Sequence, residues 1–366
     1  MNPDSLVDDL NPSQQAAVEH RGGPLLIIAG AGSGKTRVLT RRIAHLLATS
    51  DASPGQIMAI TFTNKAAAEM RERVVELVGP AARAMTVSTF HSACVRILRK
   101  EAGRLGMSTS FSIYDQTDSL RLMQMVIRDL DLDPKRYPPR SFLNHVSSAK
   151  NELIDHETYA ARASNHMEQT IAEAYAEYQR RLARGGAFDF DDLIGSTVAL
   201  LQLFPDISEH YRRRFRHVLV DEYQDTNHAQ YVLIRELVGT GDDPNLPPAG
   251  LCVVGDADQS IYAFRGATIR NIEEFERDFP NATTILLEQN YRSTQNILSA
   301  ANAVISHNSS RREKRLWTDE GSGEPIVGYV GDDEHDEASF VSEEIDRLVD
   351  DAGYRPSDVA VFYRTN

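Results

Sequence analysis

The sequence is poor in cysteine and tryptophan and contains no long apolar run. Cys94 and Cys252 are the two cysteines among 366 residues. Their wide separation argues against a disulfide framework and favours a reducing, cytoplasmic setting. No run of 18 apolar residues occurs, which excludes a membrane-spanning helix. The acidic first nine residues lack the basic segment and apolar core of a secretory signal, so we expect none.

Positive charge is also in deficit. The 39 Lys and Arg against 53 Asp and Glu give a formal net charge of −14. This argues against a protein coated in nucleic acid, but not against one that holds a single strand in a local groove. We interpret the basic clusters as solvated faces; they lie at 135–140, 180–184, 212–216 and 311–315. With 41% hydrophobic and 25% charged residues, the composition excludes disorder or coiled coil as the main architecture.

Apolar runs that alternate with helical patterns predict an α/β fold with a parallel sheet. The helical patterns at 34–47 and 65–77 each follow such a run, and residues 90–216 are mostly helical in period. The runs read as buried strands at 25–29, 57–62, 86–88, 218–220, 251–254 and 284–287.

These patterns predict four segments of chain. Residues 1–89 and 217–287 would form one α/β domain, interrupted by a helical insertion at 90–216. A second α/β unit would begin at 288, with strands near 326–330 and 358–363. A domain rarely ends on a freshly started apolar strand, because its sheet partners are then missing. We therefore expect the chain to be the front portion of a longer protein.

Residues 24–36 carry the strongest chemical signal, since an apolar run meets a glycine-rich turn and then a helical pattern. The alternate glycines from Gly30 to Gly34 would let the backbone wrap around phosphate beside a helix N-terminus. Lys35 would reach the β- and γ-phosphates, and the Thr36 hydroxyl would ligate Mg²⁺. Position 29 is alanine where the strict pattern has glycine. The predicted nucleotide-binding residues here are Ala31, Gly32, Ser33, Gly34, Lys35 and Thr36.

Two further strands should bring polar groups to the same edge of the sheet. Asp221 and Glu222 end the run at 218–220. Asp221 suits the Mg²⁺ shell, and Glu222 suits polarising the attacking water. Gln259, just after the next strand, could sense the γ-phosphate or orient the water. Each group alone could simply lie in a solvent-exposed turn. Together with the glycine-rich turn, they predict phosphoryl transfer from a nucleotide.

Seven motifs occur in one order along the chain, at 11–14, 29–36, 60–67, 88–92, 221–227, 254–266 and 287–293. With these motifs the chain closely resembles the UvrD/PcrA/Rep group of superfamily 1 DNA helicases, from about residue 10 to its last residue. The resemblance implies a RecA-like fold with an inserted helical domain and the start of a second RecA-like domain. It also implies that Gln14 reads the adenine, Arg37 lies near the nucleotide, Tyr291 stacks on the adenine, and Arg292 acts as an arginine finger.

The same resemblance implies a path for single-stranded DNA across the RecA-like domains. Aromatic side chains would stack on bases without sequence preference, and polar ones would contact phosphate or sugar. Phe264 stands where relatives often have tryptophan, and Phe190 resembles a further base-contacting position. The predicted DNA contacts are Thr61, Phe62, Thr63, Asn64, Thr89, His91, Phe190, Tyr262 and Phe264.

The resemblance implies an ATP- and Mg²⁺-dependent motor that moves 3′ to 5′ on single-stranded DNA and separates duplex at junctions in DNA repair. DNA-repair proteins would be partners, in the nucleoid-bearing cytoplasm and away from membranes. Later family motifs would lie beyond residue 366, so we expect the chain alone to bind nucleotide weakly and to unwind nothing. Two alternatives stay open: the motor portion of a recombination helicase–nuclease, and a non-catalytic DNA-binding scaffold.

Overall fold

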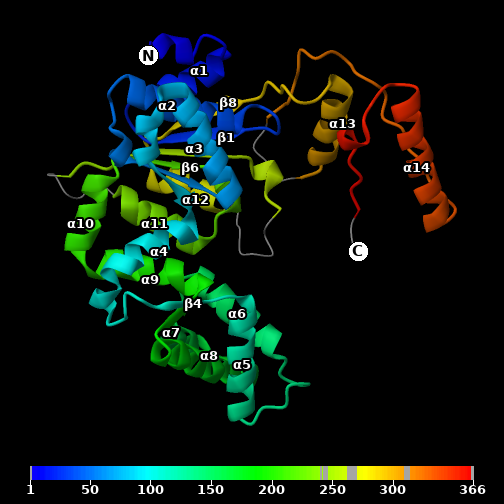
Figure 1. The fold of residues 1–366 in the computed structure, drawn as a ribbon. Helices are drawn as coiled ribbons and strands as arrows, with labels where there is room; N and C mark the ends of the chain where they lie inside the picture. The colour runs from blue at the N-terminus through cyan, green and yellow to red at the C-terminus, as the bar shows by residue number, and fades with distance from the viewer. Residues whose placement is uncertain (1, 240, 242–245, 262–269, 309–313, 364–366) are drawn as a thin grey trace.

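The computed structural model describes residues 2–239, 241, 246–261, 270–308 and 314–363 of the chain. At its centre is a six-stranded sheet in the order β3-β2-β6-β7-β1-β8, in which every neighbouring pair is parallel (Figure 1). The fold is therefore the expected α/β class with a parallel sheet. The strands are β1 Leu25–Ala29, β2 Ile57–Thr61, β3 Thr86–Thr89, β6 His217–Val220, β7 Gly250–Gly255 and β8 Thr283–Leu287.

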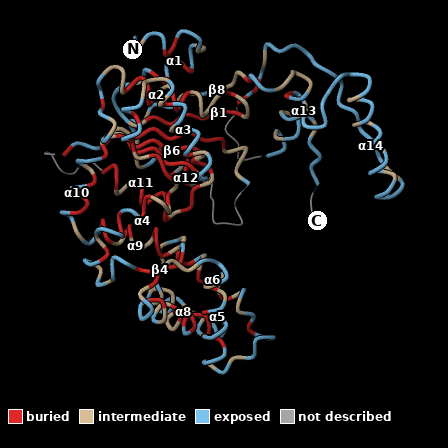
Figure 2. The backbone as a smooth tube through the Cα atoms, in the orientation of Figure 1, coloured by how far each residue is buried: buried red, intermediate tan, exposed pale blue. Residues whose placement is uncertain are grey.

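Both faces of the four inner strands, β1, β2, β6 and β7, are buried, which explains why these strands are almost continuously apolar. On one face, Leu26 and Ile28 join a core formed with α4 (Phe90–Glu101), α9 (Phe190–Leu203) and α11 (His228–Val238). On the other face, Leu25 and Ile27 pack with α2 (Lys35–Ala48) and α3 (Asn64–Val78). Figure 2 shows these strands as a buried block at the centre of the sheet domain.

A second, separate core lies in the helical part of the chain. Its buried residues come mainly from α5 (Gln116–Asp129), α6 (Pro139–Asn151) and α8 (His166–Arg184), and α7 (His156–Arg162) packs beside them. Two short parallel strands, β4 (Ser112–Tyr114) and β5 (Ala187–Asp189), lie between this part and the sheet domain (Figure 1). The separate core covers a shorter stretch of chain than the predicted insertion at 90–216, because α4, α9 and α10 (Pro205–Arg214) pack on the sheet domain.

The second unit contains two helices, α13 (Gln295–Ile305) and α14 (Glu334–Asp350), which lie to one side of the sheet domain in Figure 1. The strands predicted near 326–330 and 358–363 are wrong: these segments are irregular, and Val330 and Phe362 are more than 90% exposed. A strand needs a neighbour for its backbone hydrogen bonds, and no described segment lies beside either of them as a partner strand. None of the described helices is long and apolar enough to cross a membrane.

Candidate nucleotide site and nucleic-acid groove

The turn between β1 and α2 has the backbone shape of a phosphate-binding loop. Gly32 and Gly34 have φ of 68° and 85°, values that favour glycine. Ser33 Oγ donates to the carbonyl oxygen of Gly30 at 2.8 Å and closes the turn. A side chain on Gly30 would collide with Leu316, since its Cβ would lie 2.1 Å from a Leu316 methyl. The turn is thus shaped by its own glycines and by a residue of the second unit.

Lys35, the first residue of α2, presents a buried cation at this turn. Its ammonium has no hydrogen-bond partner within the described chain and lies 3.5 Å from Oε2 of Glu222. An unsatisfied buried ammonium costs free energy unless an anion completes its surroundings. The Lys35 ammonium is therefore placed to receive a phosphate group.

Asp221 and Glu222 leave β6 in an unusual backbone conformation. Glu222 is left-handed, with φ 49° and ψ 45°, a state that costs a non-glycine residue about 1–2 kcal/mol. Its backbone N–H donates to Asp221 Oδ1 at 3.0 Å, and its carbonyl accepts from the Asp225 N–H at 2.9 Å. Burial, and then the neighbouring Glu222 carboxylate, raise the pKa of Asp221 to about 6, while Lys35 opposes that shift. Strain and a buried charge together at one strand end are typical of a functional site.

Gln224, which the sequence reasoning missed, joins the acidic pair to the next strand. Its Nε2 donates to Glu222 Oε2 at 2.8 Å, and its Oε1 accepts from the Asp256 N–H at 2.8 Å. Gln259 donates to the Asp256 carboxylate from its own side-chain amide. The structure therefore brings Lys35, Glu222 and Gln259 into one polar network, as the sequence predicted.

The segment after β8 lies across the phosphate-binding loop. Tyr291 N donates to the Gly32 carbonyl oxygen at 3.0 Å, and the buried Asn290 donates from Nδ2 to the Ala31 carbonyl oxygen at 2.6 Å. A Cβ on Gly32 would lie 2.8 Å from Cβ of Arg292. Tyr291 and Arg292 are thus beside the loop and exposed. Asn290 was not predicted, although its neighbours were.

The remaining predicted nucleotide contacts bind protein groups here. Gln14 is buried, donates from Nε2 to the Ser33 carbonyl oxygen at 2.9 Å and accepts from the Asn11 N–H at 3.3 Å. Arg37 pairs with the Asp9 carboxylate at 2.5 Å. Gln14 therefore stabilises the loop through its hydrogen bond to Ser33. Its contact with adenine stays a prediction, as does the proximity of Arg37 to the nucleotide.

The oxygen donors at this site fit Mg²⁺. Thr36 supplies a hydroxyl in the first turn of α2, and Asp221 supplies a carboxylate that is buried beside Lys35. Such hard oxygen ligands, few in number, suit a cation that keeps waters and binds mainly through nucleotide phosphates. The described residues hold no group of three or more His, Cys, Asp or Glu able to bind a metal alone.

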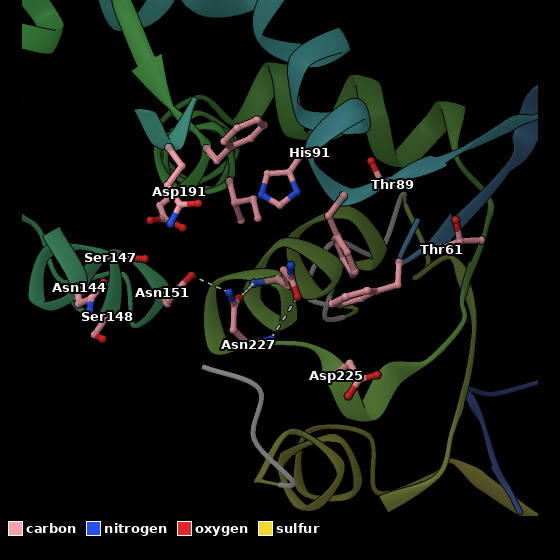
Figure 3. A pocket seen from close by; sticks show the side chains of 16 residues that line it. Thr61, Thr89, His91, Asn144, Ser147, Ser148, Asn151, Asp191, Asp225 and Asn227 are labelled. Atoms are coloured by element: carbon pink, nitrogen blue, oxygen red, sulfur yellow. Dashed lines mark hydrogen bonds between the residues drawn. The ribbon is translucent and has the colours of Figure 1, made fainter. Parts of the chain in front are cut away.

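A cavity of about 830 Å³ opens between the sheet domain and the helical part (Figure 3). The predicted DNA contacts Thr61, Phe62, Thr89, His91 and Phe190 all line it. Thr63 and Asn64 do not, and Tyr262 and Phe264 lie outside the described residues. Further lining residues are Phe90, Gln116, Asn144, Ser147, Ser148, Asn151, Asp191, Ile194, Asp225, Asn227 and Gln230.

Phe190 and His91 face one another on one wall of this cavity. Their ring centroids are 5.6 Å apart, with ring planes nearly perpendicular. Phe190 is 48% exposed, so it is not a buried core residue. Burial lowers the pKa of His91, which favours its neutral form. The hydroxyls of Thr63 and Thr89 cap the N-termini of α3 and α4, accepting from Ala66 and Ser92.

The opposite wall is a polar face of α6 that sequence reasoning missed. It consists of Asn144, Ser147, Ser148 and Asn151. Their spacing of three and four residues puts them on one side of a helix, a signal that was available in the sequence. Asn151 Oδ1 accepts from Asn227 Nδ2 at 2.7 Å and ties α6 to the sheet domain (Figure 3). The cavity is thus lined mainly with neutral hydrogen-bonding groups and aromatic rings, together with the carboxyl groups of Asp191 and Asp225.

Comparison with known proteins places the chain in a family. Residues 10–280 match the family model of the UvrD/REP helicase N-terminal domain, and residues 285–366 match that of the UvrD-like helicase C-terminal domain. The chain spans about half the length of the curated relatives it matches. It is 68% identical to ATP-dependent DNA helicase UvrD1 of Mycobacterium tuberculosis over 99% of this chain and 48% of that protein. It is 50% identical, with the same coverage, to ATP-dependent DNA helicase PcrA of Bacillus subtilis. The chain therefore belongs to the UvrD/REP helicase family.

Proposed function

We propose that this chain is the nucleotide- and DNA-binding portion of an ATP-dependent DNA helicase. The observation that carries the proposal is the buried Lys35 ammonium, which lacks a hydrogen-bond partner within the described chain and faces Glu222 across the phosphate-binding loop. Relatives that are 68% and 50% identical to this chain, over about half of their own length, are named ATP-dependent DNA helicases, which supports the same assignment.

The residues around the loop have the properties that ATP hydrolysis requires. Lys35 would bind the β- and γ-phosphates, and the Glu222 carboxylate, beside it, would accept hydrogen from the attacking water. Mg²⁺, held through Thr36 and Asp221, would supply charge neutralisation of the phosphates when bound. Gln259 would orient the water, and the exposed guanidinium of Arg292 is close enough to the loop to swing onto the γ-phosphate.

The cavity suits single-stranded DNA better than duplex. Phe62 and Phe190 offer faces for base stacking, and the hydroxyls and amides of α6 offer contacts to sugar and phosphate. Its carboxylates, Asp191 and Asp225, disfavour the dense charge of a duplex. We extend the proposal to Thr63, Asn64, Tyr262 and Phe264 as DNA contacts, and to translocation 3′ to 5′ with unwinding at junctions during DNA repair.

Movement would come from coupling between the two sites. The second unit, 288–366, would close on the sheet domain (1–89 and 217–287) when ATP binds, while the helical segment 90–216 holds the strand. The hydrogen bond from Tyr291 to Gly32 supports this coupling, because it makes the path from the second unit to the phosphates short. Repair proteins are the partners that this role implies.

ATP hydrolysis by the chain, measured with and without a single-stranded oligonucleotide, tests the proposal. We expect Mg–ATP binding, with little turnover in the isolated chain, and stimulation by DNA where turnover is measurable. Glu222→Gln should retain nucleotide binding while turnover falls about 100-fold or more. The exposed Glu334→Gln, in α14, is the matched control. Loss of all nucleotide binding in the unaltered chain would overturn the proposal.

A further inference from the structure

A lysine of the second unit, Lys314, is buried against two aspartates of the sheet domain, so the solvated face predicted at 311–315 is wrong at this residue. Its ammonium contacts Oδ1 of Asp256 and lies 3.1 Å from Oδ2 of Asp258, and 5% of its side chain is exposed. Two residues further on, Leu316 packs against Gly30 of the phosphate-binding loop. The Trp317 carbonyl oxygen also accepts from Asn290 N at 2.8 Å. Residues 314–317 are thus fixed to the wall of the nucleotide site.

The two oxygens of the Asp256 carboxylate have different partners: one contacts the second unit and the other contacts Gln259. Oδ1 faces Lys314 and also accepts from Asp258 N at 3.0 Å. Oδ2 accepts from Nε2 of Gln259. Asp256 is 2% exposed, and a carboxylate so deeply buried stays ionised only beside a positive charge. Lys314 supplies that charge.

The ionised state of Asp256 decides which way the Gln259 amide points. An ionised carboxylate can only accept hydrogen bonds, so Gln259 must turn its Nε2 toward Asp256. Its Oε1 is then the end left for an O–H donor, such as a water beside a phosphate. A protonated Asp256 could donate instead, and the amide could then turn round.

The backbone N–H of the same aspartate is linked through Gln224 to Glu222. The Asp256 N–H donates to Gln224 Oε1 at 2.8 Å, and Gln224 Nε2 donates to Glu222 Oε2 at 2.8 Å. Glu222 in turn lies 3.5 Å from Lys35. Asp256 therefore connects Lys314, which contacts its carboxylate, to Gln224, Glu222 and the phosphate-binding lysine, which are reached through its backbone N–H.

We propose that Lys314 is a positioning residue, which keeps Asp256 ionised, sets the amide of Gln259 and so couples the second unit to recognition of a nucleoside triphosphate's γ-phosphate. The inference rests on the proposed function, because it requires a triphosphate at the loop. It adds a residue that acts through Asp256 and needs no contact with nucleotide.

The test compares the affinities of the 366-residue chain for Mg–ATPγS and Mg–ADP by calorimetric titration. We expect Lys314→Met to reduce the preference for ATPγS over ADP about fivefold or more, while the affinity for ADP is unchanged within about twofold. Lys314→Arg, which retains the charge, should retain the preference. Lys135→Met, at an exposed lysine of the helical part, is the matched control and should match the unaltered chain.

A double variant separates positioning from structural support. Lys314→Met alone leaves a buried charge and should lower the melting temperature, whereas adding Asp256→Asn removes that charge and should restore it. The asparagine no longer fixes the Gln259 amide, so the double variant should still lack the ATPγS preference.

Four results would overturn the inference. If Lys314→Met kept the preference for ATPγS over ADP, the role of Lys314 would be refuted while the proposed function stands. The same conclusion would follow if the double variant regained both the preference and its stability. An equal loss of ATPγS and ADP affinity would mean structural support and would also overturn it. If the unaltered chain binds neither nucleotide, the proposed function fails and takes this inference with it.

Discussion

Asn290 donates from Nδ2 to the carbonyl oxygen of Ala31 at 2.6 Å, although the two residues are 259 positions apart in the chain. The same side chain accepts at Oδ1 from the backbone N–H groups of Arg292 and Ser293, both at 2.7 Å. One buried amide therefore holds the phosphate-binding loop and the turn that carries the predicted arginine finger in a single arrangement. Geometry at the loop depends on the second unit even before any nucleotide binds.

Asn290→Ala should therefore loosen both segments. Loss of the buried hydrogen bonds should destabilise the chain by about 1–3 kcal/mol, and nucleotide affinity should fall about tenfold because the loop is no longer pre-organised. Thermal unfolding and titration with a fluorescent nucleotide measure the two effects. Asn308→Ala, at an exposed asparagine of the second unit, is the control. Unaltered affinity in Asn290→Ala would show that the loop holds its shape alone.

Much of the fold and of the geometry around the candidate nucleotide site could be predicted because the signals are local. The run before Lys35, the glycines and the acids after β6 each form a short pattern, and parallel strands place their carboxyl ends at one edge. Gly32 and Gly34 were predicted from motif spacing, and their positive φ values explain the glycine in physical terms. Phe190 was given as a DNA contact, and the structure places its exposed ring on the cavity wall.

What sequence reasoning missed is mostly long-range. Gln224, Asn290 and Lys314 contact partners on other elements, and no local pattern shows that Leu316 fills the space beside Gly30. The strand predicted at 358–363 failed for the opposite reason. Its apolar pattern is local, but a strand forms only where a neighbour accepts its hydrogen bonds.

Phe190→Ala should weaken binding of single-stranded DNA while nucleotide binding is unchanged. The ring is 48% exposed and contacts His91 edge-on, and stacking of one base on an aromatic ring is worth about 1–3 kcal/mol. Fluorescence anisotropy with an oligothymidine measures the change, which corresponds to roughly 5- to 150-fold in affinity. Phe340→Ala, which removes a ring stacked on Tyr329 near α14, is the control. Equal affinities for both variants would remove Phe190 from the DNA path.

Binding of single-stranded DNA should weaken as the pH rises from 5 to 7.5. Burial, and then Asp189, raise the pKa of Asp191 to about 6; burial, and then Glu222, raise that of Asp225 to about 6. Both cavity carboxylates therefore become charged within this range and repel phosphate, while burial lowers the pKa of His91 and favours its neutral form.

A single variant isolates the contribution of Asp191. One unit charge near a phosphate is worth about 1 kcal/mol in a high-dielectric groove. Asp191→Asn should therefore raise the affinity for single-stranded DNA roughly fivefold at pH 7.5, which makes the affinity depend less on pH. Affinities should be measured at constant ionic strength, because salt changes phosphate contacts as well. Asp350→Asn, at an exposed aspartate of α14, should leave the profile unchanged. A profile independent of pH in the unaltered chain would contradict the assignment of both carboxylates.

Asp221→Asn should make the chain more stable and less able to bind Mg²⁺–nucleotide. Its native pKa of about 6 lies above the unfolded value near 3.9. The native state therefore binds more protons between these values, and the free energy of unfolding falls as the pH rises through them. A shift of about two units corresponds to about 3 kcal/mol at pH 7, which a neutral asparagine of the same shape would recover.

The gain should vanish at low pH, and this dependence identifies its cause. Near pH 4 the native Asp221 is already neutral, so aspartate and asparagine should unfold at similar denaturant concentrations, whereas at pH 7 the asparagine variant should need more. The amide oxygen of the introduced asparagine can still accept the hydrogen bond that Glu222 N makes to Asp221 at 3.0 Å, so the backbone turn is kept. Nucleotide affinity should lose its dependence on Mg²⁺ because the anionic ligand is gone. A variant that is less stable at pH 7 would show that the Asp221 charge is already compensated by Lys35. In that case the buried Asp221 charge does not lower the free energy of unfolding, and the strained backbone turn at Glu222 is the destabilising feature of the site.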